Sequence, residues 1–545
     1  MRVKHAFCAW LDCLPVGTGN DFFNSKSWVD AADDPCRITE LKVGTWVAWP
    51  LAFVAGISFP LAFAPFYYAL VGPLALAVLF LLWSSVSAKR AAGLGLMFGI
   101  GSFGVGVSWV FVSLHHYGNM PTALAVGVTV VFILILSFYL AAVGFCQARW
   151  QRLPMGLRLI VLMPAVWVLM EWLRGWLLGG FPWMYLGYSQ LDTPLAGFAP
   201  FGGVLGVSFL SAVTAGAAAW GVHSGGRAWA GATGVVVLIV LGSALVGRSE
   251  PVMPTGDALK VVVIQNNISL SDKWQHGNAR SIRERYLAAS IDSGGPDLIV
   301  WPEAALPEFL DGLLPEFLQD LSNHPADFVI GLLERRQQKG YLELFNSALG
   351  IGDEQSVYRK RQLVVFGEYL PLRPLLGWLL RYLDIPMSDF SSWQERQAPM
   401  TLAGQQVGVT ICYEDAFPWL VRRSLPEATM LVNISEDAWF GDSLAPHQRL
   451  QMARFRALES GRALVRASNN GLSALIDRRG QVLQLAPQFS AVVLSGMVQP
   501  ATGTTVYVRY GDAPLVGGLL LLLAIAFLVN KKVAVGGSTR DITIT

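Results

Sequence analysis

The chain has 545 residues, of which 53% are hydrophobic and only 14% are charged. Because soluble domains carry about 25% charged residues, this composition argues against an ordinary soluble protein and favours one built for lipid. The formal net charge of +2 gives no reason to expect a nucleic-acid partner. The five cysteines lack the paired spacing of a disulfide framework or a metal site, so no metal and no cofactor is expected.

Residues 1–42 are polar and mixed in composition. Their apolar stretch, at 7–14, is short and is interrupted by Asp12, so it is a poor signal-peptide core. We interpret this segment as a leader of unknown role.

Residues 43–247 form the predicted membrane domain. A membrane-spanning helix needs about 20 apolar residues. The apolar runs that predict about seven helices lie at 43–59, 66–85, 91–114, 122–147, 157–178, 204–222 and 229–246. An eighth run, at 514–530, would be the last span, and residues 531–545 would form a cytoplasmic tail.

The basic residues between these runs predict the orientation, because Lys and Arg are enriched in cytoplasmic connections. Placing the N-terminus in the cytoplasm leaves the opposite connections, at 60–65, 115–121 and 179–201, without any Lys or Arg. Both termini are then cytoplasmic, and residues 248–511 lie outside the cytoplasm. The basic residues that sort to the cytoplasmic side are Lys89, Arg90, Arg149, Arg152, Arg158, Arg227, Lys531 and Lys532.

Two opposite charges, Glu171 and Arg174, lie near the outer end of the fifth run. Their i, i+3 spacing on a helix suggests a structural ion pair. The alternative is a role near the lipid headgroups, because charged side chains inside a membrane are costly and are often functional.

Residues 258–498 are predicted to form one α/β domain, long enough to bury a core. Helical patterns at 279–290 and 446–460 separate strand-like runs. These runs lie at 260–265, 297–301, 328–333, 406–412, 430–435, 463–467 and 473–476.

Three residues of this domain carry the groups that acyl transfer needs: a thiol (Cys412), a carboxylate (Glu303) and an amine (Lys360). They would act as nucleophile, proton carrier and stabiliser of the developing oxyanion. Each has a simpler interpretation when taken alone. A free cysteine is most often a small buried hydrophobe, a glutamate after a strand often lies on a surface loop, and a basic triplet is usually solvated.

The motifs around these residues resemble, in chain order, the nitrilase superfamily, and most closely its membrane-embedded branch, the apolipoprotein N-acyltransferases. The resemblance implies an αββα sandwich at 258–498 beside a polytopic α-helical membrane domain. The stretches that carry it lie at 301–307 (Trp-Pro-Glu-Ala-Ala-Leu-Pro), 358–371, 411–414 (Ile-Cys-Tyr-Glu), 437–443, 451–459 and 466–471, with 171–175, 180–183 and 187–190 in the membrane part.

The resemblance implies a role for each matching position. Cys412 would be the nucleophile that carries an acyl thioester, Glu303 the general base and Lys360 the stabiliser of the oxyanion. The supporting positions are Glu368, a second glutamate of the site, Tyr413 and Glu414, which flank the nucleophile, and Trp274, an aromatic important for activity.

The activity implied is acyl transfer from a phospholipid, expected to be phosphatidylethanolamine, to the N-terminal amine of diacylglyceryl-cysteine in an apolipoprotein. This is the last step of bacterial lipoprotein maturation, in the inner membrane, with the catalytic domain facing the periplasm. Two alternatives remain at this point: a membrane-tethered amidase that uses the same three residue types, and a transporter or receptor whose outer domain only binds a ligand.

Three positions depart from the family pattern. Glu436 replaces the usual Asn before Asp-Ala-Trp-Phe-Gly, Val365 replaces a Pro before Phe-Gly-Glu, and Asn266 replaces a Gly after Gln265. Only Glu436 adds a charge, so it puts the electrostatics of the site in doubt.

Overall fold

The computed structural model describes residues 45–249, 251–275, 277–338, 341–365, 367–369 and 390–538. The predicted leader, residues 1–42, and the last seven residues of the predicted tail lie outside the described residues. Residues 43–545 belong to one compact unit, which contains both the apolar helices and the α/β domain.

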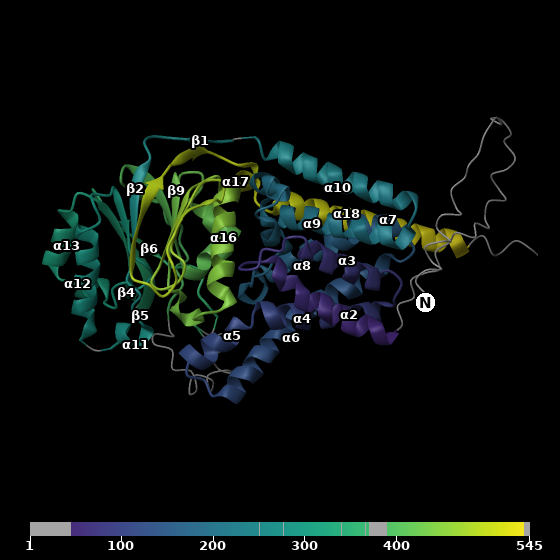
Figure 1. The fold of residues 1–545 in the computed structure, drawn as a ribbon, viewed down its shortest axis with the longest axis horizontal. Coiled ribbons are helices and arrows are strands. Elements are labelled where there is room, and N and C mark those ends of the chain that lie inside the picture. Colours follow the sequence, from purple (N-terminus) through teal and green to yellow (C-terminus); the bar gives the residue numbers. More distant parts are fainter. Residues whose placement is uncertain are drawn as a thin grey trace, which may run out of the picture. The chain divides into compact units, whose positions relative to one another are not determined.

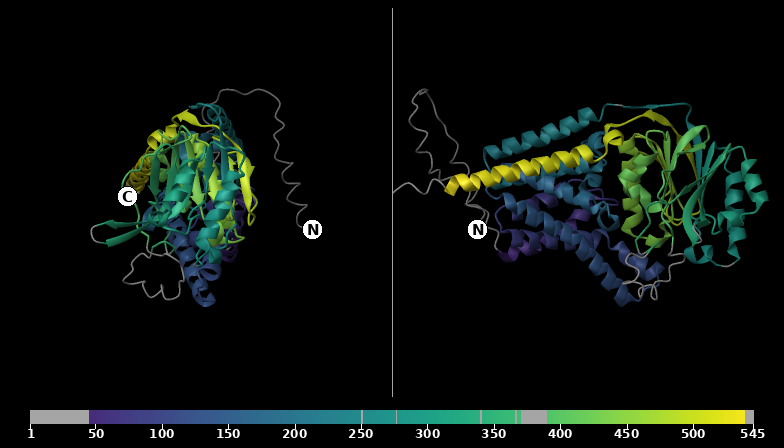
Figure 2. Two further views of the ribbon diagram at one scale, coloured as in Figure 1. Left: turned by 90° about the vertical axis from the view of Figure 1, so that its left-hand side faces the viewer. Right: turned by 180° about the vertical axis from the view of Figure 1, so that it is seen from behind.

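Apolar helices make up most of the described chain up to residue 249, and one more lies near its end (Figures 1 and 2). In Figure 2 the last helix, in yellow, runs alongside the earlier ones, and it contacts α8. These helices are α2 (Thr45–Ser58), α3 (Val71–Trp83), α4 (Ala88–Gly106), α5 (Trp109–Val112), α6 (Thr122–Gln147), α7 (Met155–Leu157), α8 (Met163–Arg174), α9 (Ala199–Ser224), α10 (Arg227–Val246) and α18 (Ala513–Ser538).

Each predicted apolar run contains a helix, although residues 66–70 precede α3 and are not helical, and the predicted number of about eight spans stays a prediction. Among the described residues, five helices are long and apolar enough to cross a membrane, or six if the bent pair formed by α4 and the helical turns at Trp109–Tyr117 is one span. The helices at the first two predicted positions, Trp46–Ala62 and Val71–Trp83, are apolar but shorter. The last helix extends to Ser538, so the predicted tail begins inside α18.

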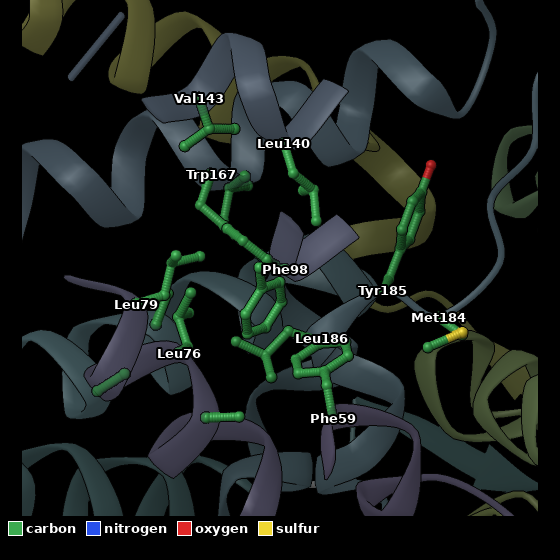
Figure 3. Packing of buried hydrophobic residues seen from close by; sticks show 14 of the residues in the cluster. Phe59, Leu76, Leu79, Phe98, Leu140, Val143, Trp167, Met184, Tyr185 and Leu186 are labelled. Atoms are coloured by element: carbon green, nitrogen blue, oxygen red, sulfur yellow. The ribbon is translucent and has the colours of Figure 1, made fainter. Parts of the chain in front are cut away.

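Small residues and aromatic rings in edge-to-face contact hold the membrane helices together. A Cβ on Gly95 of α4 would lie 2.3 Å from the carbonyl oxygen of Leu140 in α6, so only glycine permits this approach of the two backbones. Figure 3 shows Phe98 between Phe59 and Trp167. Their ring centroids lie 5.7 and 6.3 Å from that of Phe98, both in edge-to-face geometry.

The predicted ion pair between Glu171 and Arg174 is wrong. Both side chains are described, and no ion pair joins them. Glu171 Oε1 accepts hydrogen bonds from Trp167 Nε1 at 2.9 Å and from the backbone N of Leu186 at 2.8 Å. Arg174 instead donates to the carbonyl oxygen of Trp183 at 2.5 Å. Arg174 is therefore satisfied by the segment that follows α8, and Glu171 by that segment together with Trp167 of α8 itself.

Residues 252–503 contain two six-stranded sheets and a short two-stranded sheet. The order of the first large sheet is β13-β2-β3-β4-β5-β6, and that of the second is β12-β11-β10-β9-β8-β7. The strands are β1 (Val252–Pro254), β2 (Leu259–Gln265), β3 (Leu298–Val300), β4 (Asp327–Gln338), β5 (Tyr341–Ile351), β6 (Gln355–Arg359), β7 (Met400–Leu402), β8 (Gln405–Ile411), β9 (Met430–Ser435), β10 (Leu464–Ser468), β11 (Ala474–Ile476), β12 (Val482–Leu485), β13 (Val492–Val498) and β14 (Ala501–Gly503).

Side chains point alternately to the two faces of each strand, so each sheet packs on both sides and a four-layer sandwich results. In β2, Val261 and Val263 pack between the two sheets, whereas Val262 and Ile264 pack against α12 (Asn278–Ile291) and α13 (Pro315–Ser322). The outer face of the second sheet is covered by α16 (Leu444–Ser460). Figure 1 shows α12 and α13 on one side of the strands and α16 on the other, which confirms the predicted αββα fold.

Helix α16 also contacts the membrane domain through polar side chains. Gln448 accepts a hydrogen bond from Trp183 Nε1 and donates to the carbonyl oxygen of Gly106 at 3.1 Å. Arg454 forms an ion pair with Asp192, with 2.5 Å between NH2 and Oδ1. One face of this helix is therefore fixed to the catalytic sheet and another to the membrane helices.

Candidate active site

The three predicted catalytic residues lie at the carboxyl ends of strands from both sheets. Glu303 follows β3, Lys360 directly follows β6, and Cys412 directly follows β8. All three are buried and line one cavity, so the structure brings together side chains that lie 52 to 109 residues apart in sequence.

Lys360 lies between two carboxylates. Its Nζ is 3.1 Å from Glu303 Oε1 and 2.7 Å from Glu368 Oε1. Asn346 Nδ2 donates to the same two oxygens, at 2.7 and 3.1 Å. The other oxygen of Glu303, Oε2, accepts from the backbone N of Glu436 at 2.7 Å. Both oxygens of Glu303 are thus held in fixed directions.

These contacts set the protonation states at rest. Burial alone would raise the pKa of Glu303, but Lys360, the Cys412 thiol and Asn346 together hold it below its ordinary value. The pKa of Lys360 is raised because Glu303 and Glu368 outweigh the effect of burial. Burial and the charge of Glu303 raise the pKa of the Cys412 thiol to about 12. The resting site therefore holds a carboxylate, an ammonium and a neutral thiol.

Cys412 occupies a strained turn. Its φ is +52°, a left-handed conformation that residues other than glycine rarely adopt. Glu414 fixes this turn, because its carboxylate accepts from the backbone N of Ile411 at 2.8 Å and from that of Arg361 at 2.6 Å. Glu414 is fully buried and is not among the residues that line the cavity. Its contacts join the turn of Cys412 to the segment of Lys360.

A second cation lies beside the thiol. Arg449 of α16 places NH1 3.5 Å from Cys412 Sγ and 2.6 Å from Ser435 Oγ. The Ser435 hydroxyl is itself 3.8 Å from the sulfur. Among the described residues, Arg449 and Lys360 therefore both place a positive charge near the Cys412 thiol.

Glu436, the charged departure from the family pattern, is neutralised by a neighbour. Its carboxylate forms a buried ion pair with Lys273 and accepts from Asn469 Nδ2 at 3.2 Å. Burial raises the pKa of Glu436, and Lys273 opposes that rise. Val365 also lines the cavity, whereas Asn266 is not among its lining residues.

The cavity has a volume of about 800 Å³ and is mainly apolar. Glu368, Tyr413 and Trp274 line it, as do the three predicted catalytic residues. Further walls come from the catalytic domain, including Leu333 and Phe440, and the rest come from residues of the membrane domain. The latter are Trp109, Val110, Ser113, Leu114 and Gly118, then Val128, Phe132, Ile135, Leu136 and Tyr139 of α6, and then Arg174, Leu177, Leu178, Gly180, Phe181 and Trp183.

Sequence reasoning missed two side chains of this site, Asn346 and Arg449. Asn346 is followed by Ser347 in β5, within Leu-Phe-Asn-Ser-Ala-Leu, where polar and apolar residues mix, so nothing local singles it out. Arg449 lies in a helix rich in Gln and Arg, where no single basic residue stands out.

Gly331 of β4 is expected to position Glu303. A Cβ at Gly331 would lie 2.1 Å from the carbonyl oxygen of Pro302 and 2.7 Å from the Cα of Glu303, so Gly331→Ala must displace the backbone there. A displacement of about 1 Å costs on the order of 100-fold in rate. We expect that loss in a single-turnover assay of cysteine acylation, with the unfolding midpoint lowered by only a few degrees.

The matched control is Gly312→Ala, because a Cβ on Gly312 meets no atom within 4 Å. Activity of the Gly331→Ala protein at the Gly312→Ala level would contradict this role of Gly331.

Comparison with known proteins covers both parts of the chain. The family described as "Apolipoprotein N-acyltransferase N-terminal domain" matches residues 55–217, and "Carbon-nitrogen hydrolase" matches residues 260–507. Over 488 residues the chain is 40% identical to an apolipoprotein N-acyltransferase of Methylococcus capsulatus, covering 88% of this chain and 96% of the relative. The corresponding protein of Nitrosomonas europaea is 41% identical over 493 residues, covering 88% and 98%.

Among solved structures, a carbon-nitrogen hydrolase superfamily protein from Xanthomonas campestris is similar at 17% identity and a TM-score of 0.35. The match covers 49% of this chain and 97% of that protein.

Proposed function

Because this chain belongs to the apolipoprotein N-acyltransferase family, we propose that it transfers an acyl chain from a phospholipid, through a thioester on Cys412, to diacylglyceryl-cysteine of apolipoproteins. It is a membrane-bound N-acyltransferase of lipoprotein biosynthesis with a nitrilase-like catalytic domain. The observation that carries the proposed roles is one cavity that Cys412, Glu303 and Lys360 share with membrane helix α6.

In the first half-reaction, Glu303 takes the proton of the Cys412 thiol while the sulfur attacks the ester carbonyl of the phospholipid. Lys360 stabilises the negative charge that develops on the carbonyl oxygen. The C–O bond then breaks, the proton passes from Glu303 to the leaving alkoxide, and lysophospholipid departs. The low pKa of Glu303 and the high pKa of the thiol support this order, because the thiolate forms only as attack proceeds.

In the second half-reaction, the α-amine of diacylglyceryl-cysteine attacks the thioester. Glu303 takes a proton from the nitrogen, a C–N bond forms, and the C–S bond breaks. The electron pair leaves on sulfur, which regains its proton from Glu303. The apolar lining of the cavity favours an amine acceptor that arrives with lipid chains over attack by water.

The apolar wall also supports a lipid donor. Phe132, Ile135 and Leu136 come from one face of α6 and line the same cavity as Cys412. We assign phosphatidylethanolamine as the preferred donor, with its acyl chain against this wall. The amidase alternative has less support, because the relatives over most of the chain carry the acyltransferase name.

The proposed topology places the domain at 258–498 in the periplasm and both termini in the cytoplasm, with the membrane domain at 43–247 and the last span at 514–530 in the inner membrane. The distribution of Lys and Arg supports it. Single cysteines at the exposed positions His116 and Arg152, in a protein whose native cysteines are replaced, would test it. A membrane-impermeant maleimide should label the first in intact cells and the second only after lysis.

The central test measures the two half-reactions separately. Detergent-purified full-length protein is incubated with phosphatidylethanolamine, and its intact mass is recorded before and after neutral hydroxylamine. We expect a hydroxylamine-labile acyl adduct, which then disappears with formation of an amide when a diacylglyceryl-cysteine peptide is added. Release of free fatty acid without amide formation would favour the amidase instead.

The acylation rate should be nearly independent of pH between about pH 5.5 and 8.5. Glu303 is ionised above its pKa, which lies below the ordinary 4.5, and the base is lost only as pH falls through that lowered value. The thiol, with a pKa of about 12, stays protonated throughout this range. Single-turnover acylation followed by mass spectrometry checks this. A rate that rises tenfold per pH unit would mean that free thiolate, and not Glu303, drives attack.

A further inference from the structure

The guanidinium of Arg449 contacts the sulfur of Cys412 from within a buried cluster. Arg449 is 1% exposed, and its NH1 lies 3.5 Å from Sγ. Both residues line the cavity, so this contact lies at the atom that would carry the acyl group. The distance is within the range of a hydrogen bond to sulfur, and such a bond strengthens when the sulfur is charged.

The neighbours of Arg449 fix its direction. NH1 also donates to Asp437 Oδ1 at 2.7 Å, and NH2 donates to Asp415 Oδ1 at 3.2 Å. Arg466 bonds the same two carboxylates, at 2.8 Å to Asp415 and 2.9 Å to Asp437. Two guanidiniums thus face two carboxylates, and their formal charges balance while Cys412 is a thiol or a thioester.

Only the thiolate form adds negative charge to this arrangement. Arg466 also bonds both carboxylates, so each of them keeps a guanidinium partner when Arg449 is replaced. Arg449 is the one of the two that reaches the sulfur. Its charge also opposes the rise in the thiol pKa that burial and Glu303 cause.

We propose that Arg449 is a further catalytic residue, which donates its NH1 hydrogen bond to Cys412 whenever the sulfur is a thiolate. The inference rests on the proposed function, in which Cys412 is the nucleophile. Lys360 then stabilises negative charge on the carbonyl oxygen, whereas Arg449 stabilises negative charge on the sulfur. In the described residues these two cations hold different carboxylates, Glu303 and Glu368 for one and Asp415 and Asp437 for the other.

The thiolate appears twice in the reaction. In the first half-reaction the proton leaves Sγ for Glu303, and the sulfur lone pair forms the C–S bond. In the second, the C–N bond forms, the C–S bond breaks and its electron pair returns to sulfur. Arg449 keeps its own proton in both steps and stabilises the sulfur only while the charge is present, which is the condition for lowering a barrier.

The test measures the thiol directly. Purified full-length protein is alkylated with iodoacetamide over a range of pH, and the Cys412 peptide is followed by mass spectrometry. Arg449→Gln should raise the pKa of Cys412 by about one to two units. Because a thiolate of higher pKa is also more nucleophilic, the alkylation rate at a fixed pH below the pKa should fall by about three- to tenfold.

A second variant, Arg449→Lys, keeps one positive charge between Asp415 and Asp437 and so preserves the balance of the cluster. Its ammonium cannot bind both carboxylates and the sulfur at once, so we expect a smaller shift in the same direction. The control is Arg462→Gln. Arg462 is also a buried arginine, but it donates to backbone carbonyls such as that of Ala428, and we expect the alkylation profile to match the wild type.

A wild-type profile in either folded Arg449 variant would overturn the inference, and an equal shift in Arg462→Gln would assign the effect to general loosening of the domain. Acyl-enzyme formation from phosphatidylethanolamine is measured on the wild type in parallel. If the wild type forms the acyl adduct but the Arg449 variants keep the wild-type alkylation profile, only the role of Arg449 is rejected. Absence of the adduct from folded wild type would reject the proposed function.

Discussion

Cys412→Ala protein is expected to form no acyl adduct and to lose at least about 10⁴-fold in amide formation, because no other group can carry the acyl chain. The buried thiol contacts Glu303, Arg449 at 3.5 Å and Ser435 at 3.8 Å, and each of these keeps other hydrogen bonds, so the fold should remain. The unfolding midpoint should change by only a few degrees. Intact mass after incubation with phosphatidylethanolamine, combined with thermal unfolding, measures both expectations.

Cys146→Ala is the matched control, since Cys146 is a free, half-buried cysteine in α6 outside the lining of the cavity. It should acylate at the wild-type rate. A hydroxylamine-labile adduct of wild-type size on Cys412→Ala would assign the nucleophile to another residue and would end the thioester mechanism as written.

Lys360→Met is expected to be the second most damaging change, because it removes the cation between Glu303 and Glu368. Loss of the oxyanion stabiliser should cost about 10²–10³ in acylation rate. Two carboxylates bonded to Asn346 would then face each other unpaired, so the free energy of unfolding should fall by about 3–5 kcal/mol. One carboxyl pKa should rise, and the acid limb of acylation should move toward neutral pH.

A double variant separates the two effects. Lys360→Met with Glu368→Gln removes one of the opposed charges and should recover most of the stability but none of the activity. The surface control is Lys260→Met, since Lys260 contacts only the Gly294 carbonyl with its exposed amine. Recovery of acylation in the double variant would show that Lys360 acts by holding Glu303 and not by stabilising the oxyanion.

The positions of the catalytic residues could be predicted because of where they lie relative to the strands. Glu303 and Cys412 each follow an apolar run, and these runs form β3 and β8, both of which have a neighbouring strand on each side. All seven predicted strands and both predicted helices of the catalytic domain are confirmed, with ends shifted by a few residues. Long apolar runs give a strong signal because both of their faces are buried.

The edge strands were not predicted, and Asn346 was missed with them. β5 and β6 form antiparallel pairs at one edge of the first sheet, where polar residues such as Glu343 alternate with apolar ones. This mixture resembles a loop when it is read one segment at a time. Asn346 becomes meaningful only when pairing of β5 brings it to Glu303.

The contacts of α16 could not be predicted for a different reason. Its sequence, with Gln448, Arg449 and Gln451, resembles a solvated helix, yet these side chains are buried. Their partners lie in the membrane domain and on distant strands, so nothing local indicates that they are satisfied. The same limitation explains Glu171 and Arg174. Their i, i+3 spacing suggested that they pair, whereas the residues after α8 supply the partner of Arg174 and one of the two partners of Glu171.

The double attachment of α16 constrains how the two parts of this protein can change. Gln451 donates to the carbonyl oxygen of Tyr188 and accepts from the backbone N of Ala64, while Arg454 pairs with Asp192. A chimera that joins this catalytic domain to the membrane helices of a distant relative would leave such groups unmatched, at about 1–3 kcal/mol each. Such hybrids should be unstable unless the partners of α16 are transplanted with it. The membrane domain and the catalytic domain are therefore expected to evolve together.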